Sequence, residues 1–311
     1  MRLQITFHDS YWYCYANCTA MLLSSVGEHV SPRVIEALSS VGLGAFMKND
    51  LPFFGQLATP DKGISQALRL LGFTFVEVAG EMPDQEPFDQ LGALLREGPA
   101  ILGPLDMMHL SYNPTRPTQP GVDHYVLAYR LDGDRVHLHD PAGFANVFID
   151  RPQLMRAWRA DTVPYHRGHY RYWTAPQRST EPSEAEIFEA AIDTFQQLYR
   201  EAEQRAAIDK ALIGRHAIIT LAERVSSTSL SEQQRHHLTH FALPLGAKRA
   251  LDYAKFFAGL HEPLQKLKLE QATAFGACLT HLVAANWISA GEYLRRLAEI
   301  ETGIKDAILR I

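Results

Sequence analysis

The chain has 311 residues, of which 46% are hydrophobic and 21% are charged, and its formal net charge is −5. This length and composition can bury a sizeable core and predict one large domain or two ordinary ones. The acidic balance argues against a nucleic-acid interface, and no apolar run approaches the roughly 18 residues that a membrane span requires. The opening MRLQITFHDS lacks the apolar region of a signal peptide, so we expect a soluble cytoplasmic protein.

Helix and strand signals alternate over about the first 180 residues. Apolar residues at helical spacing predict a helix over 14–26, and Ser31 followed by Pro32 marks the start of the next helix. Further helices are expected at 63–71, 87–98 and 152–160, and further strands at 73–78, 99–105, 144–149 and 169–175.

The clearest strand signal is the stretch HYVLAYRLDGDRVHLHD, which runs from His124 to Asp140. Two strand-like runs flank a short turn that contains Asp-Gly, which predicts a hairpin. In an antiparallel hairpin the start of the first strand lies beside the end of the second. We therefore expect His124 and Asp140 to lie next to each other.

The chain changes character after a polar, proline-bearing stretch at 176–182, and the rest is predicted to be helical. Ser183 and Glu186 have the spacing of a capping box that opens the first of these helices. Further helical segments are expected at 208–225, 231–241, 246–260, 264–286 and 289–309. The predicted fold class is α+β: a domain over 1–178 with an antiparallel sheet, followed by an all-helical domain over 183–311.

The three cysteines, Cys14, Cys18 and Cys278, are too few and too irregularly spaced for a disulfide scaffold or a four-ligand zinc site. A cysteine nucleophile needs a base and a group that orients that base. Cys14 stands where the lead-in YWY gives way to an apolar helix, so the helix dipole and free N–H groups favour negative charge there. Cys18 lies one turn inside the helix, and we assign it and Cys278 to packing.

The predicted hairpin supplies the other two groups of a catalytic triad. His124 is the candidate base and Asp140 the candidate orienting carboxylate. Taken singly, Cys14 fits a small buried residue, His124 a core histidine and Asp140 an ordinary turn residue. The order of the three along the chain and the expected pairing of the last two favour catalysis.

The order of cysteine, strand histidine and strand aspartate resembles that of papain-like cysteine enzymes. CYANCTAMLLSSVG and HYVLAYRLDGDRVHLHDPAG are similar to the motifs of their peptidase C39-like branch. A narrower resemblance is to the family of the butirosin-biosynthesis acyltransferase BtrH. The cysteine helix, SPRVIEALSSVGLGAF, GPLDMMHLSY and GAKRALDYAKFFAGL carry it.

The resemblance implies a papain-like catalytic domain and a helical domain that covers or flanks its active site. It also implies transfer of an acyl or aminoacyl group from a thioester, on an acyl or peptidyl carrier protein, to a small amine in specialised metabolism. No cofactor is expected. The sequence departs from the pattern at Tyr13, where the family commonly has histidine, and at His8, where C39 peptidases have the glutamine of the oxyanion hole.

Two other functions fit the same residues. Water in place of the amine would make the protein a cysteine peptidase or amidohydrolase, and a non-catalytic binding protein could retain the fold. The apolar C-terminal helices could also support a homodimer.

Several polar residues are secondary candidates for the site. The Cys14 backbone N–H is the safer oxyanion donor, and His8 is an alternative. Three residues immediately before a proline-rich loop are candidates for the rim of the cleft, with a simple strand end as the alternative: Asp106, His109 and Tyr112.

Two further clusters lie in the helical half of the sequence. Arg249 and Tyr253 share a helix face, where they either contact substrate or pack, and packing is favoured. His236, His237 and His240 cluster in one segment, and His236 and His240 have the spacing of metal ligands, but no third carboxylate or cysteine ligand is nearby in the sequence, so a solvated helix face is favoured. We therefore predict no metal site.

Overall fold

The computed structural model describes residues 5–10, 12–48, 50–55, 57–80, 85–165, 167–209 and 212–311. The chain forms two compact units, and each combines two segments: Met1–Ile35 with Ile64–Glu181, and Glu36–Gly63 with Pro182–Ile311. The predicted linker at 176–182 contains the last of the three boundaries, between Glu181 and Pro182. The predicted division into 1–178 and 183–311 is wrong for residues 36–63, which belong to the helical unit.

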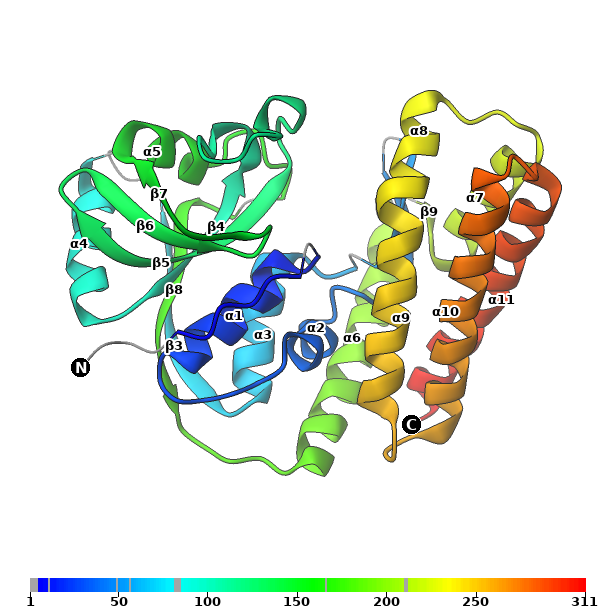
Figure 1. The fold of residues 1–311 in the computed structure, drawn as a ribbon. Coiled ribbons are helices and arrows are strands. Elements are labelled where there is room, and N and C mark those ends of the chain that lie inside the picture. The colour runs from blue at the N-terminus through cyan, green and yellow to red at the C-terminus, as the bar shows by residue number, and fades with distance from the viewer. Residues whose placement is uncertain are drawn as a thin grey trace. The chain divides into compact units, whose positions relative to one another are not determined.

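The first unit is built on a six-stranded sheet in the order β3-β8-β4-β5-β6-β7, with every neighbouring pair antiparallel (Figure 1). Its strands are β3 (Phe73–Gly80), β4 (Ala100–Asp106), β5 (Asp123–Asp132), β6 (Arg135–Asp140), β7 (Phe144–Asp150) and β8 (His169–Arg178). Its helices are α1 (Cys14–Ser24), α4 (Gln85–Glu97) and α5 (Arg151–Arg159), and α2 (Pro32–Ser39) and α3 (Pro60–Leu70) have residues in both units.

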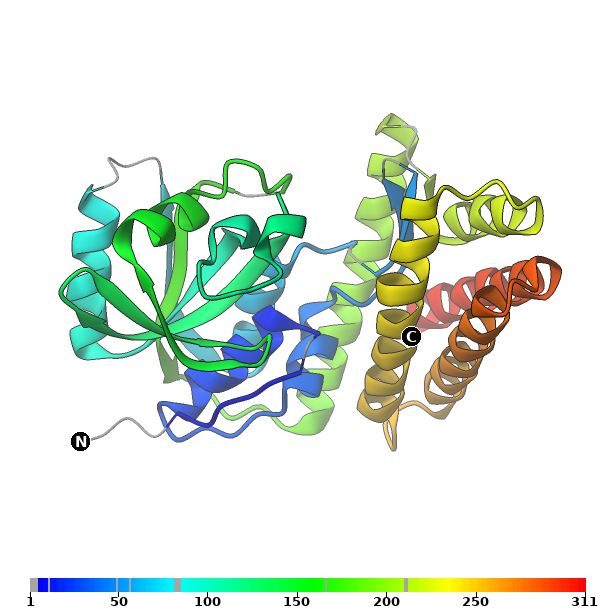
Figure 2. The same cartoon turned by 45° about the horizontal axis from the view of Figure 1, so that its top comes forward.

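Helices cover both faces of this sheet because its central strands are apolar on both sides. Leu102 and Val126 pack in one buried cluster with residues of α4 and α5. On the other face, Tyr125 of β5 meets Tyr15 of α1 with ring centroids 6.2 Å apart. Figure 2, in which the top of the molecule comes forward, shows α5 in front of the strands. Nearly every residue of α1 is buried, as expected for a helix that is apolar all round.

The predicted hairpin is confirmed as β5 and β6. The two strands pair in antiparallel register from Leu127 opposite His139 to Asp132 opposite Arg135. The neighbouring β4 approaches β5 so closely that a Cβ on Gly103 would overlap the Tyr125 ring. Glycine at this position therefore allows the central strands to pack.

The second unit combines helices with a small three-stranded sheet in the order β2-β1-β9. Its helices are α6 (Glu184–Asp209), α7 (Gly214–Ser226), α8 (Glu232–His237), α9 (Leu243–Phe257), α10 (Glu262–Val283) and α11 (Trp287–Arg310). Its strands are β1 (Ala45–Lys48), β2 (Leu51–Phe54) and β9 (Leu212–Ile213). The unit is therefore not all-helical as predicted, since residues 36–63 contribute a hairpin to it.

Most of the helical predictions in the second unit are confirmed, but the two helices expected at 231–241 and 246–260 form one continuous run from α8 through a π-helical turn at Leu238–Ala242 into α9. The Ser183 backbone N–H donates to Glu186 Oε2 at 2.8 Å and the Glu186 N–H donates to Ser183 Oγ at 3.3 Å, which is the predicted capping box at the start of α6. Helix α10 packs against α9 and α11, and α11 packs against α7. Within the described residues, no helix has the length and apolar character needed to cross a bilayer.

Candidate active site

Cys14 is the first residue of α1, and its position depends on an unusual turn. Tyr13 adopts a left-handed conformation with φ 64° and ψ 46°, which is uncommon for a residue with a side chain. The buried Asn17 amide holds this turn, because its Nδ2 lies 2.9 Å from the Tyr13 carbonyl oxygen and 2.8 Å from Ser10 Oγ. Strained backbone held in this way is typical of functional sites. The Cys14 side chain remains half-buried at the start of the helix.

His124 and Asp140 meet as the hairpin predicted. His124 Nε2 lies 2.6 Å from Asp140 Oδ1, and both side chains are buried. Burial alone would lower the pKa of His124, but the charges of Asp140 and Cys14 and hydrogen bonds with both raise it well above its usual value. His124 therefore joins the thiol to the carboxylate. Since Nε2 faces Asp140, Nδ1 is the ring nitrogen left to exchange a proton with Cys14.

Asp140 is held as an anion by several donors. Its Oδ1 accepts the Ala142 backbone N–H at 2.7 Å, and its Oδ2 accepts the Tyr112 hydroxyl at 2.9 Å. Burial would raise the pKa of Asp140, but the charge of His124 and these hydrogen bonds lower it. The shifts of the two partners agree in direction, because His124 gains and Asp140 loses proton affinity when they form an ion pair.

The strand pairing is irregular on both sides of the hairpin, next to His124 and next to Asp140. The register of β4 on β5 shifts between Leu102 and Leu105, which lies opposite His124, and that of β6 on β7 shifts between Leu138 and Asp140. Bulges of this kind redirect side chains and are frequent beside active sites. The positions of both residues thus depend on where the regular ladder is interrupted.

The other two cysteines are buried, as expected for packing residues. Burial raises the pKa of Cys18 well above its usual value, with smaller contributions from Cys14 and Asp140. Burial also raises the pKa of Cys278 to about 12. Both thiols remain protonated at neutral pH, which leaves Cys14 as the cysteine that can react.

The three rim candidates have different places. Tyr112 donates to the buried carboxylate of Asp140, so its hydroxyl lies behind the triad. Asp106 accepts the Met108 and Gly121 backbone N–H groups at 2.9 and 3.2 Å and the Thr162 hydroxyl, and it is itself buried. Asp106 therefore fixes a loop, and its place at the rim of the cleft stays a prediction.

His109 and His8 are both half-buried, and nothing links either of them to the triad among the described residues. His109 ends a short 3-10 helix over Met107–His109. Burial lowers the pKa of His8, and the charges that act on it are those of Asp9 and His29. The oxyanion role of His8 stays a prediction.

Arg249 and Tyr253 are buried in the second unit, so the packing interpretation of this pair is confirmed. Arg249 Nε donates to Glu36 Oε1 at 2.9 Å, and its Nη1 donates to the Phe54 carbonyl at 2.9 Å. The Tyr253 hydroxyl donates to the Ala37 carbonyl at 3.2 Å. These contacts connect α9 to the segment 36–63 that the sequence had assigned to the first domain.

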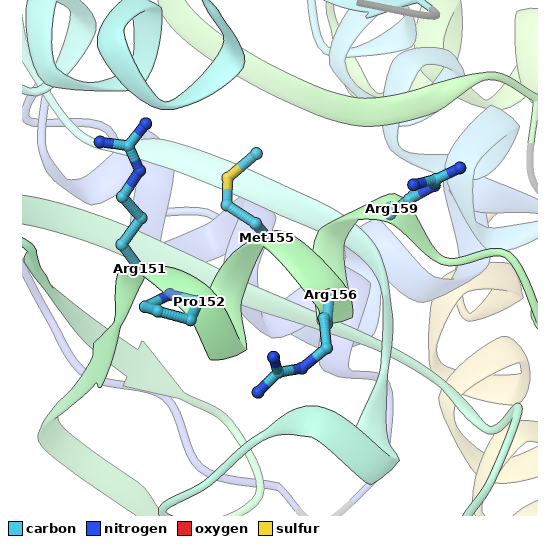
Figure 3. Close-up of a pocket in the computed structure, with 5 residues that line it drawn as sticks. All are labelled: Arg151, Pro152, Met155, Arg156 and Arg159. Carbon is cyan, nitrogen blue, oxygen red and sulfur yellow. The ribbon is translucent and has the colours of Figure 1, made fainter. Parts of the chain in front are cut away.

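The described part of the chain contains no group of three or more His, Cys, Asp or Glu side chains that could hold a metal ion. The His236 and His240 rings lie 4.4 Å apart, one above the other along the helix. A cavity on the first unit is lined by five residues of α5, which Figure 3 shows as sticks: Arg151, Pro152, Met155, Arg156 and Arg159. This cavity contains no residue of the triad and no nucleophile, so it is not the catalytic centre.

The sequence did not identify Asn17 as a residue of the site, and it did not reveal the partner of Tyr112. Asn17 holds the turn before the nucleophile, and its only sequence signal is an amide one turn inside an apolar helix. Tyr112 was noted, but its partner Asp140 lies 28 residues away, which no local pattern predicts.

The chain is 39% identical over 299 residues to the uncharacterized protein YobF of Bacillus subtilis (strain 168), and the match covers 96% of both proteins. The model of the YobF C-terminal domain matches residues 208–309, which lie in the second unit. Neither match names an activity. The papain-like fold and the resemblance to the butirosin acyltransferase family therefore stay predictions.

Proposed function

We propose that this chain, which belongs to the YobF family, is a cysteine-dependent acyltransferase that acts through a thioester on Cys14. The observation that carries the proposal is the chain of contacts from Cys14 through His124 to Asp140. A half-buried thiol beside a buried base and its orienting carboxylate is the arrangement that nucleophilic cysteine catalysis requires.

In the first half-reaction, the Cys14 thiolate, which is paired with protonated His124, attacks the carbonyl carbon of an acyl thioester. The oxyanion of the tetrahedral intermediate is stabilised by the Cys14 backbone N–H at the start of α1. The bond to the donor sulfur then breaks, and His124 donates its proton to the departing sulfur. Cys14 is left carrying the acyl group as a new thioester.

In the second half-reaction, an amine attacks the thioester on Cys14 and His124 accepts a proton from the attacking nitrogen. The C–S bond breaks, an amide leaves, and the Cys14 thiolate is again paired with protonated His124. Asp140 keeps the His124 ring oriented and stabilises its charged form in both halves. No cofactor is needed in this scheme.

The placement of the groups supports a papain-like catalytic unit. The nucleophile begins a helix that packs on an antiparallel sheet, and the base and carboxylate come from neighbouring strands of that sheet. Transfer to an amine and a carrier-bound donor rest on the resemblance to the butirosin acyltransferase family. In this proposal the helical unit binds the carrier protein or the acceptor.

The test of the proposal is the fate of an acyl group offered as an N-acetylcysteamine thioester. The proposal predicts amide formation that rises with added amine and is absent in the Cys14→Ala variant. Release of the free acid at the same rate with and without amines would assign the site to a hydrolase. Equal product formation by the Cys14→Ala variant would remove Cys14 from the reaction.

A further inference from the structure

A tyrosine–carboxylate contact lies one step beyond the triad. Asp140 has two oxygen atoms, and His124 and the Ala142 N–H use only Oδ1. Oδ2 accepts the Tyr112 hydroxyl at 2.9 Å. Removing this donor would leave an oxygen of a buried anion with one hydrogen bond fewer, which is costly. The contact therefore stabilises the Asp140 carboxylate, whose negative charge the triad uses.

The Tyr112 ring is fixed in place from two sides. It packs against the hydrophobic core of the first unit and meets the Phe144 ring edge-on, with centroids 5.8 Å apart. Burial raises the pKa of Tyr112 well above its usual value, and the charge of Asp140 raises it further. The hydroxyl therefore keeps its proton, and it is a permanent donor rather than a group that exchanges protons with the triad.

The loop that carries Tyr112 is closed at both ends by one side chain. Asp106 Oδ1 accepts the N–H groups of Met108 and Gly121, which stand before and after the loop. Inside the loop, Asn113 Oδ1 accepts the Thr115 backbone N–H at 2.9 Å. These local bonds fix the conformation of the loop, and the loop in turn holds the Tyr112 hydroxyl within hydrogen-bond distance of Asp140.

From this geometry we infer that Tyr112 is a positioning residue, which sets the strength of the Asp140–His124 pair by donating to the free oxygen of Asp140. The inference rests on the proposed function. A hydrogen bond to an anion disperses its charge and lowers its proton affinity. With the Tyr112 donor present, Asp140 holds the His124 proton less tightly, and His124 can release that proton to the departing sulfur in the first half-reaction.

The experiment is the alkylation of folded protein by iodoacetamide across pH 4–11, with the rate at Cys14 followed by mass spectrometry. Cys18 and Cys278 are buried, so Cys14 is the thiol that reports. In wild type the rate should change in two steps. The upper step marks the pH at which His124 loses its proton and the thiolate is freed from the ion pair.

Tyr112→Phe should move the upper step to higher pH by about half a unit to one unit, because Asp140 then binds the charged His124 more tightly. The matched control is Tyr199→Phe, which removes a similar buried bond of 3.0 Å to Glu301 in the second unit. That control should leave the profile unchanged. In an Asp140→Asn background, Tyr112→Phe should add no further shift.

An unchanged profile in Tyr112→Phe, with its circular dichroism spectrum intact, would overturn the inference, and so would an equal shift in the Tyr199→Phe control. A wild-type rate that follows one ordinary thiol titration would show that no ion pair exists, and would overturn the inference and the triad together. Failure of acyl transfer alone is measured in the separate assay with the N-acetylcysteamine thioester. It would refute the proposed function and leave the two-step profile standing.

Discussion

Both units bury charged groups, but the two sets of groups are arranged differently. In the first unit, His124 and Asp140 stand next to Cys14, whose side chain is half-buried. In the second unit, Lys268 Nζ donates to Gln271 at 3.0 Å, and the Gln271 amide donates to Glu301 at 3.2 Å. A network of buried charged groups by itself therefore does not identify a functional site.

The second network lacks a reactive atom within reach of solvent. Lys268 lies 4.8 Å from the centre of the Tyr253 ring and is only 2% exposed. The nearby Arg249 pairs with Glu36, so the cluster connects α9 to residues 36–63. We interpret this network as a structural device that joins the two segments of the second unit. The first network, with its half-buried nucleophile, is interpreted as catalytic.

The largest expected effect is on activity, and it concerns the network of the first unit. His124→Ala should lower the rate of Cys14 acylation by about 100-fold to 10,000-fold, because the general base and the ion pair are both lost. The matched control is His137→Ala on the same hairpin, whose half-buried ring contacts Arg130 and takes no part in the triad. Stopped-flow acylation of the two variants measures the difference. Similar rates for both variants would contradict the catalytic role of His124.

The next effect concerns the stability of the second unit. Arg249→Met leaves the Glu36 carboxylate buried without its partner, and should lower the free energy of unfolding by about 3–5 kcal/mol. Lys248→Met at the neighbouring position removes a partly exposed pair with Asp252 and should cost about 1 kcal/mol or less. Urea denaturation followed by circular dichroism compares them. Equal losses would show that the Arg249–Glu36 pair has no special part in joining the segments.

Lys268 should give the stability a distinctive pH dependence. Burial lowers its pKa from 10.5 to about 8 in the folded protein. Between these values the unfolded chain binds more protons, so this group makes the free energy of unfolding rise with pH, by about 2–3 kcal/mol from pH 8 to 10.5. Urea denaturation of wild type and Lys268→Met at pH 8, 9 and 10 isolates the contribution of Lys268 to this pH dependence, because the other titratable groups are common to both proteins. A constant difference between them would show that the ammonium is not destabilised by burial.

The smallest effect tests the two cysteines of α1 against each other. Cys18→Ala should leave the rate of Cys14 acylation within about twofold of wild type, since Cys18 only packs in the core. Intact-mass kinetics with the same thioester provide the rate. A loss comparable to that of His124→Ala would mean that Cys18 takes part in the reaction.

The sequence was most informative where partners lie close along the chain. The Asp-Gly turn predicts the β5–β6 hairpin, and the hairpin brings His124 to Asp140 across 16 residues. The capping box at Ser183 is equally local. Short-range signals of this kind depend on backbone geometry alone and need no knowledge of the tertiary fold.

Long-range contacts account for what the sequence did not reveal. Arg249 and Glu36 are 213 positions apart, so no local pattern assigns residues 36–63 to the helical unit. Strands β1 and β2 are only four residues long each, and Pro52 weakens the strand signal of the second. Asp106 was a rim candidate because it stands just before a proline-rich loop. Its side chain closes that loop by accepting from Met108 and Gly121, which the sequence alone does not reveal.

The central claim is that Cys14 carries the acyl group, and the most direct test is the mass of the protein itself. After brief incubation with an acyl N-acetylcysteamine thioester and acid quench, intact mass spectrometry should show one added acyl group. Peptide mapping should place this group on Cys14, and hydroxylamine should remove it. No adduct in the wild-type protein under conditions of turnover, or an adduct of equal yield in Cys14→Ala, would contradict the account.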